Sequence, residues 1–87
     1  MTKLYIYCLF EKDDNFYGVY SSLKAAHRDA LKLCNKGNSE VYIITESGPS
    51  KPTFGAVRGL FQGECDVKVK YTSNVATAVI VKTKLRE

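Results

Sequence analysis

Apolar residues recur at helical spacing in one stretch of the chain. At about 100° per residue they fall on one stripe of a helix. That stripe consists of Leu23, Ala26, Ala30, Leu33 and Cys34, with His27 and Leu31 on its edge. Ser22 stands before it, where a serine hydroxyl accepts hydrogen bonds from the first turn, and Gly37 follows it, where glycine commonly ends a helix. A helix with one apolar stripe needs a sheet to cover.

Five other segments have the patterns of strands. They are residues 3–10, 16–20, 40–46, 65–71 and 75–81. The first and the last of these are apolar on both faces, which predicts that they lie inside the sheet. The alternation in 65–71 turns Lys68 and Lys70 outward. Gly18, in the second segment, marks a bulge or a close approach between strands.

A second, shorter helix is predicted for residues 53–62. Thr53 can cap this helix and Gly63 can close it. The preceding residues 47–53 are rich in Gly, Pro and Ser and predict a loop. In chain order the elements are β-β-α-β-α-β-β. We therefore expect a single two-layer α+β domain over residues 1–87, with two helices on one face of a mixed or antiparallel sheet.

The composition agrees with one folded domain. The chain has 87 residues, of which 45% are hydrophobic, and this content argues against disorder. Its three cysteines form no CxxC pair, and all three fall at positions predicted to be apolar and inward-facing, which favours free thiols. The chain shows no signal peptide and no long apolar run. We therefore expect a cytoplasmic location and no membrane partner.

Residues that could carry chemistry are few. The only histidine, His27, has no nucleophile or carboxylate pattern beside it, so it is interpreted as a packing residue. One histidine and three scattered cysteines give no metal-ligand spacing. The glycines of residues 55–63 lack the Lys-Ser/Thr pair of a phosphate-binding loop. The sequence predicts no enzyme, no metal site and no cofactor.

Positive charge is concentrated in the second half of the chain. The net charge is +4, and residues 51–87 contain seven basic and three acidic residues, which accounts for the whole excess. With a two-residue turn at residues 73–74, Lys70 would lie opposite Thr77 and Lys68 opposite Val79. Such clustering favours an anionic partner, and a solvated lysine surface is the alternative interpretation. The candidate anion-binding residues are Lys68, Lys70, Lys82, Lys84, Arg86 and Arg58.

Three tyrosines form the other candidate group. Tyr5, Tyr7 and Tyr42 would share the sheet face away from the helices if the first and third strands were neighbours. Aromatic rings on an open sheet face are used by several modules to stack single-stranded bases. The chain lacks the K/R-G-F/Y-G/A-F-V-x-F/Y pattern of one such module. Packing of these rings against a second copy of the protein, or over a sheet edge, is the alternative.

The Tyr-rich first strand, the stretch GVYSSLKAA and the following Tyr-Ile strand, within residues 3–46, resemble small accessory proteins of T4-like bacteriophages. The resemblance carries no site residue. It implies a non-catalytic protein that modifies host machinery or blunts host defences in the host cytoplasm, in some cases through RNA.

Together, these observations predict a nucleic-acid-binding protein, with RNA favoured, that uses its basic C-terminal hairpin. The alternative is an inhibitor or adaptor that contacts a host or defence protein, including as a homodimer.

Overall fold

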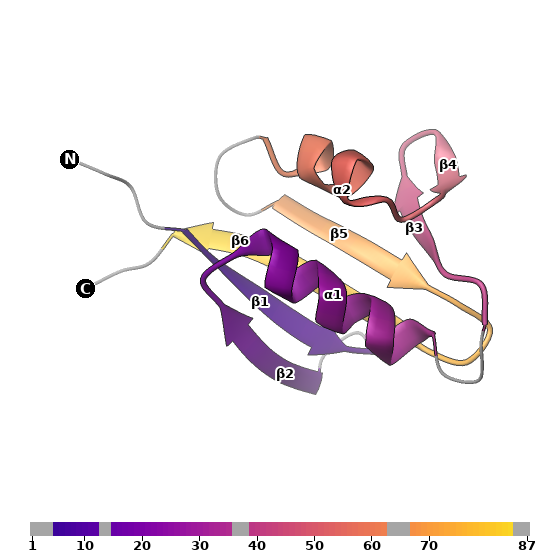
Figure 1. Ribbon diagram of the computed structural model, residues 1–87, viewed down its shortest axis with the longest axis horizontal. Coiled ribbons are helices and arrows are strands. Elements are labelled where there is room, and N and C mark those ends of the chain that lie inside the picture. The colour runs from indigo at the N-terminus through magenta and orange to yellow at the C-terminus, as the bar shows by residue number, and fades with distance from the viewer. Residues whose placement is uncertain (1–4, 13–14, 36–38, 63–66, 85–87) are drawn as a thin grey trace.

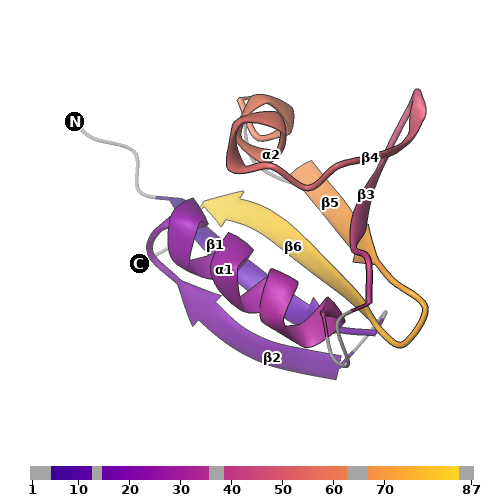
Figure 2. The ribbon, with the colours of Figure 1, turned by 45° about the vertical axis from the view of Figure 1, so that its right-hand side comes forward.

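A computed structural model describes residues 5–12, 15–35, 39–62 and 67–84. The elements in chain order are β1 (Tyr5–Glu11), β2 (Asn15–Tyr20), α1 (Leu23–Cys34), β3 (Tyr42–Thr45), β4 (Gly48–Ser50), α2 (Phe54–Leu60), β5 (Val67–Thr72) and β6 (Thr77–Lys84). The six strands form one antiparallel sheet in the order β2-β1-β6-β5-β3-β4. Both helices lie on the same side of it (Figures 1 and 2). The predicted α+β class is confirmed.

The segment predicted as a loop after β3 contains a strand. Gly48 has a φ of 105°, and the hydroxyl of Thr45 donates a hydrogen bond to the Gly48 carbonyl oxygen at 2.8 Å. This tight turn folds the chain back, so that the three residues of β4 pair with β3. Pro49 is tolerated there because β4 is an edge strand. The short, Gly- and Pro-containing strand has no apolar alternation, which is why its pattern predicted a loop.

The turn between β5 and β6 is longer than predicted. Four residues, Ser73–Ala76, connect the two strands instead of two. The observed partner of Lys70 is therefore Val79, and that of Lys68 is Val81. Both lysines still point outward, as the alternation of β5 predicted.

Helix α1 forms as its pattern predicted. The Ser22 hydroxyl accepts a hydrogen bond from the backbone N–H of Ala25 at 3.1 Å. The buried residues of α1 are those of the predicted stripe and its edge: Leu23, Ala26, His27, Ala30, Leu33 and Cys34. Asn35 caps the C-terminal end, whereas Gly37, the predicted stop, lies outside the described residues.

The core fills the space between the helices and one face of the sheet. Its largest fully buried side chains are Tyr71, Leu9, Ile43, Ile80, Val57 and Cys34. They come from four strands and from both helices. Thr53 caps α2 as predicted, by accepting a hydrogen bond from the backbone N–H of Ala56. Burial raises the pKa of the Cys34 thiol to about 11, so this cysteine stays protonated in the core.

Replacing Leu33 with alanine should lower the free energy of unfolding by about 2–4 kcal/mol, because Leu33 is only 7% exposed and the thin core cannot refill the space. The matched control is Leu60→Ala on α2. Leu60 is 39% exposed, so its truncation should cost less than about 1 kcal/mol. Urea denaturation of both variants measures the difference. Equal losses would show that Leu33 does not belong to the core.

Candidate functional site

The sheet face opposite the helices is crossed by two rows of mainly apolar side chains. The pairing of the strands gives one row across all six strands: Phe16, Phe10, Val79, Lys70, Ile44 and Pro49. The second row crosses four strands: Val19, Cys8, Val81 and Lys68. At about 4.8 Å between strands, the first row spans about 24 Å. We call the surface of these ten side chains the uncovered face.

A β-bulge brings two exposed residues of β2 onto this face. The pairing of β1 with β2 is regular at Leu9 and Gly18 but then skips Tyr17, so that Phe10 pairs with Phe16. Without the extra residue, Phe16 and Val19 would point to opposite faces, because their positions differ by an odd number. The bulge was predicted at Gly18 and lies beside it.

Much of the apolar surface on the uncovered face is accessible to solvent. Phe16 is 60% exposed, Val19 55% and Ile44 43%. Phe10 is half-buried, and its ring meets the Phe16 ring edge-on with 5.8 Å between the centroids. A shallow hollow of about 370 Å³ lies along β1, β6 and β5, between Phe10 and Lys68. Exposed apolar patches are frequent at binding surfaces, which makes this face the candidate site.

The first strand is turned over relative to the prediction. Leu9 is fully buried, and Tyr7 packs edge-on against Phe61 with 5.8 Å between ring centroids. Tyr5 and Tyr7 therefore face the helices, not the uncovered face. Cys8 faces away from the helices, although it was predicted to point inward. Both faces of β1 are apolar, so its alternation cannot show which face is inside.

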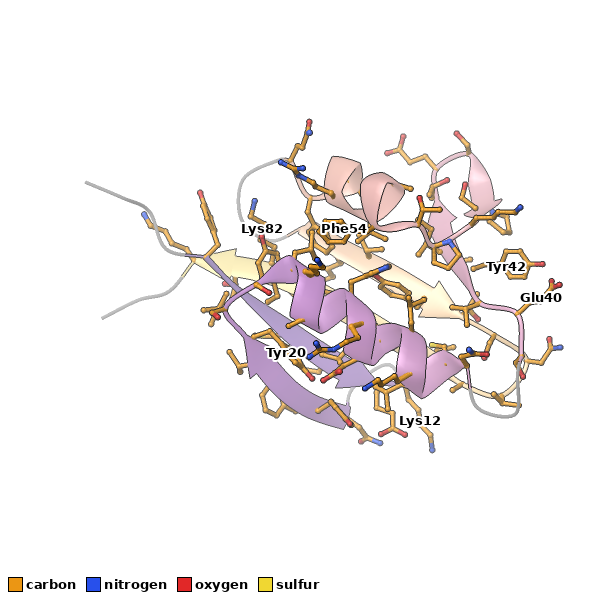
Figure 3. All side chains as sticks on the ribbon, in the orientation of Figure 1. Lys12, Tyr20, Glu40, Tyr42, Phe54 and Lys82 are labelled. Carbon is orange, nitrogen blue, oxygen red and sulfur yellow. The ribbon has the colours of Figure 1, made fainter. Side chains whose placement is uncertain are left out.

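The three predicted tyrosines do not come together. Strands β6 and β5 separate β1 from β3, so Tyr42 lies far along the sheet from Tyr5 and Tyr7. Tyr42 shares the face of Ile44 and is 38% exposed. Its hydroxyl donates a hydrogen bond to the Glu40 carboxylate, which raises the pKa of Tyr42 (both are labelled in Figure 3).

The predicted cluster of basic residues is divided between the two faces of the sheet. Lys68 and Lys70 project from β5 onto the uncovered face. Lys82 turns toward the helices: its ammonium donates a hydrogen bond to the carbonyl oxygen of Phe61 at 2.9 Å and lies 4.5 Å from the centroid of the Tyr5 ring. The predicted basic surface of the hairpin is therefore wrong for Lys82.

The other predicted cations also lie off the uncovered face or outside the described residues. Lys84 pairs with Tyr5 and therefore shares the helix side of the sheet. Arg58 is an exposed residue of α2. Arg86 lies outside the described residues. Of the five predicted cations that the structure describes, only Lys68 and Lys70 come together on an open surface.

The aliphatic and phenylalanine residues of the uncovered face were missed by the sequence analysis. Phe10, Phe16 and Val79 are the main examples. A signal for them was present in the sequence, because the first and last predicted strands are apolar on both faces and the two predicted helices were expected on one face. In the described part of the chain, no helix covers the second apolar face of β1 and β6.

His27 belongs to the core, as predicted. It is 8% exposed, and its Nδ1 lies 2.7 Å from the Tyr71 hydroxyl, which is also buried. The Phe54 ring lies beside it, with 5.6 Å between centroids. Burial lowers the pKa of His27 and raises that of Tyr71, so both groups are neutral near pH 7. His27 and Tyr71 therefore form a buried, hydrogen-bonded pair that joins α1 to β5.

Similarity to known proteins, metal-ligand groups and membrane-spanning helices are the remaining features to consider. No family model matches the chain, and no curated protein or solved structure matches it either. Among the described residues, no group of three or more His, Cys, Asp and Glu side chains is placed to hold a metal ion. No helix in that part of the chain is both long and apolar enough to cross a bilayer. Function must therefore be inferred from the chain's own surfaces.

Acidification should destabilise the protein through His27. The pKa of His27 in the folded state lies below its ordinary value of 6.5, so the unfolded chain binds more protons as the pH falls. The stability that depends on the neutral ring is complete above the ordinary pKa and is lost as the pH falls toward the folded pKa. Thermal unfolding at about pH 7.5 and about pH 5.5 tests this, because carboxylates with ordinary pKa values titrate little in that range.

His27→Gln supplies the control for this measurement. Glutamine does not titrate, and His27 is the only histidine. The variant should melt at a lower temperature than the wild type at about pH 7.5 but lose less of its Tm on acidification. Equal losses of Tm in the two proteins would contradict a role for His27 in the pH dependence.

Proposed function

We propose that the protein is a non-catalytic binding protein that holds single-stranded nucleic acid, RNA in the first place, on the uncovered face. The observation that carries the proposal is the position of Lys68 and Lys70, which stand within the two rows of apolar and aromatic side chains. A single strand offers planar bases and phosphates together. Aromatic platforms with nearby cations are the surfaces that bind it.

The arrangement of charge on the uncovered face supports an anionic ligand. Lys70 lies between Val79 and Ile44 in the first row, and Lys68 ends the second row. No acidic residue occupies a described strand position of this face. A ligand that covers the apolar rows therefore meets positive charge in the middle of the sheet.

The aromatic residues favour a single strand over a duplex. Phe16 and Phe10 stand on neighbouring strands at one end of the first row, and Tyr42 lies near the other end. Bases can stack on such rings only when they are not paired and stacked with other bases, as in single-stranded RNA. The resemblance to accessory proteins of T4-like bacteriophages also supports a binding role, directed at a host or defence component in the host cytoplasm.

A protein partner is the second candidate for the same face. One half of the uncovered face is formed by β2, β1 and β6. In the two rows of side chains this half carries no charged residue, and its members include Phe16, Val19, Cys8 and Val81. Such a surface fits an apolar surface of another protein, including a second copy of this chain. The salt dependence of binding separates the two candidates, because contacts with phosphates weaken in salt and apolar contacts do not.

Reversing the two lysine charges should remove the electrostatic part of binding. With two phosphate contacts at about −0.7 each, the logarithm of the wild-type affinity for single-stranded RNA should fall with the logarithm of salt concentration at a slope of about −1.4. Lys68→Glu with Lys70→Glu should weaken binding to all sequences alike and flatten that slope. Fluorescence anisotropy with a labelled oligouridine across a salt series measures both effects.

The matched control is Arg58→Glu with Lys84→Glu. This pair changes the net charge by the same amount, but neither residue lies on the uncovered face. The control should keep the wild-type slope and affinity within about twofold. Equal losses of affinity in both double variants would mean that the net charge of the protein, and not the uncovered face, attracts RNA. Absence of RNA binding by the wild type at low salt would leave the protein partner as the function.

Truncating Phe16 tests the stacking contribution separately. Phe16→Ala should weaken binding of the oligouridine by about 1–3 kcal/mol while the salt slope stays unchanged, because a stacked base is lost and no phosphate contact is. Phe16 is 60% exposed, so the fold should tolerate the change. Leu60→Ala, an exposed apolar residue on the helix side, should bind as the wild type does. An unchanged affinity of Phe16→Ala would contradict stacking on this ring.

A further inference from the structure

A groove of about 590 Å³ runs beside α1 on the helix side of the protein. Its wall follows the helix from Ser22, before the first turn, to Asn35, at the C-cap. At 1.5 Å per residue this length is about 20 Å. The opposite wall includes Phe54, at the start of α2 (labelled in Figure 3). The groove therefore follows the length of α1, and Phe54 is its one lining residue from another element.

The floor of the groove is apolar. It includes the half-buried Leu31 and the Phe54 ring, which is 36% exposed. The edge of the His27 ring also reaches the groove, packed beside Phe54. Since His27 is neutral and its Nδ1 is engaged with Tyr71, this part of the floor adds no charge. A ligand that fills the groove must present an apolar surface to it.

The rim of the groove on the α1 side is positively charged. Lys24, Arg28 and Lys32 are exposed, line the groove and follow each other at every fourth residue, so they form one row along the helix. The Arg28 side chain is 65% exposed and lies 3.6 Å from the Asp29 carboxylate. That carboxylate also accepts a hydrogen bond from the Tyr20 hydroxyl at 2.6 Å. Three cations therefore line the groove, and one of them, Arg28, already has an anionic neighbour in Asp29.

We propose that this groove docks an acidic amphipathic helix of a partner protein. The length of about 20 Å fits three to four turns of helix. A helix that lies beside α1 repeats its side chains at the same period, so carboxylates four residues apart can meet the three cations in turn. Its apolar stripe then covers the floor, as in other helix-in-groove complexes. A compact ligand with a single carboxylate would engage only one of the cations.

The groove and the uncovered face are separate surfaces. The groove lies on the helix side of the sheet, and the lysine pair Lys68 and Lys70 lies on the other side. Occupation of one surface leaves the other accessible. The docking proposal therefore does not depend on the proposed nucleic-acid function, and each can fail alone.

The probe for this test is a synthetic helical peptide of about 14 residues, which is about 20 Å long, with leucines along one face and glutamates beside them. Labelled with a fluorophore, it should bind the wild-type protein saturably in an anisotropy titration. Arg28→Glu with Lys32→Glu should weaken binding about tenfold or more, since two attractive contacts become repulsive. Both residues are exposed, and circular dichroism checks that the variant is folded.

Two controls make the result specific to the groove. Lys68→Glu with Lys70→Glu gives the same change in net charge on the opposite face and should leave peptide binding within about twofold. A peptide with glutamines in place of the glutamates should bind about tenfold more weakly or worse. In a ¹⁵N–¹H spectrum, the acidic peptide should shift the amide signals of Ala25, Leu31 and Phe54 and leave those of Cys8 and Val81 in place.

Several outcomes would overturn the proposal. Without saturable binding of the acidic peptide, the groove is not a docking site for such a helix. Equal weakening of peptide binding in the two double variants would show that net charge alone attracts the peptide. Equal binding of the glutamine peptide would show that the rim takes no part. Loss of oligouridine binding in Arg28→Glu with Lys32→Glu, with peptide binding unaffected, would assign the groove to nucleic acid instead.

Discussion

The structure depends on how two short helices share one six-stranded sheet. Helix α1 has 12 residues and α2 has 7, and both lie on one face. A chain of this size buries only about 60–65% of its unfolded surface, which is too little to build a third layer. The central strands β1 and β6 nevertheless carry apolar side chains on both faces. The uncovered face follows from this constraint, because its apolar side chains stay in contact with water instead of being buried.

A hydrogen bond from the Tyr20 hydroxyl of β2 to the Asp29 carboxylate ties α1 to the sheet, and two further polar contacts hold the helix in place. The first joins His27 to Tyr71 inside the core. The second joins the C-terminal end of the helix to the β5–β6 turn, where the Ser73 hydroxyl donates to the Cys34 carbonyl oxygen at 2.6 Å. That carbonyl is one of those that have no partner within the helix. Because these contacts fix α1, the row of cations on it keeps one position relative to the sheet.

The sequence predicted α1 and the outward lysines of β5, because one face of each element is plainly apolar. It could not orient β1, where Leu9 and Cys8 are equally acceptable inside the core. The separation of Lys82 from Lys68 was predictable but missed. In the β5–β6 pairing an odd-numbered residue always faces an even-numbered one. An even-numbered lysine of β5, such as Lys68, and an even-numbered lysine of β6, such as Lys82, must therefore point to opposite sides. Any β5–β6 turn with an even number of residues places Lys68 and Lys82 on opposite sides of the sheet.

Net charge along the sequence describes the surfaces poorly. Residues 1–50 contain equal numbers of basic and acidic residues, yet the charged rim of the groove comes from them. Their acidic residues Asp29 and Glu40 each accept a hydrogen bond from a tyrosine. What distinguishes the two surfaces is how cations are placed relative to apolar area. On the uncovered face they stand inside a broad apolar surface, which suits a flat ligand that carries charge between its planar groups. Along α1 they form a row beside the apolar Leu31 and Phe54, which suits a rod with charge on one side.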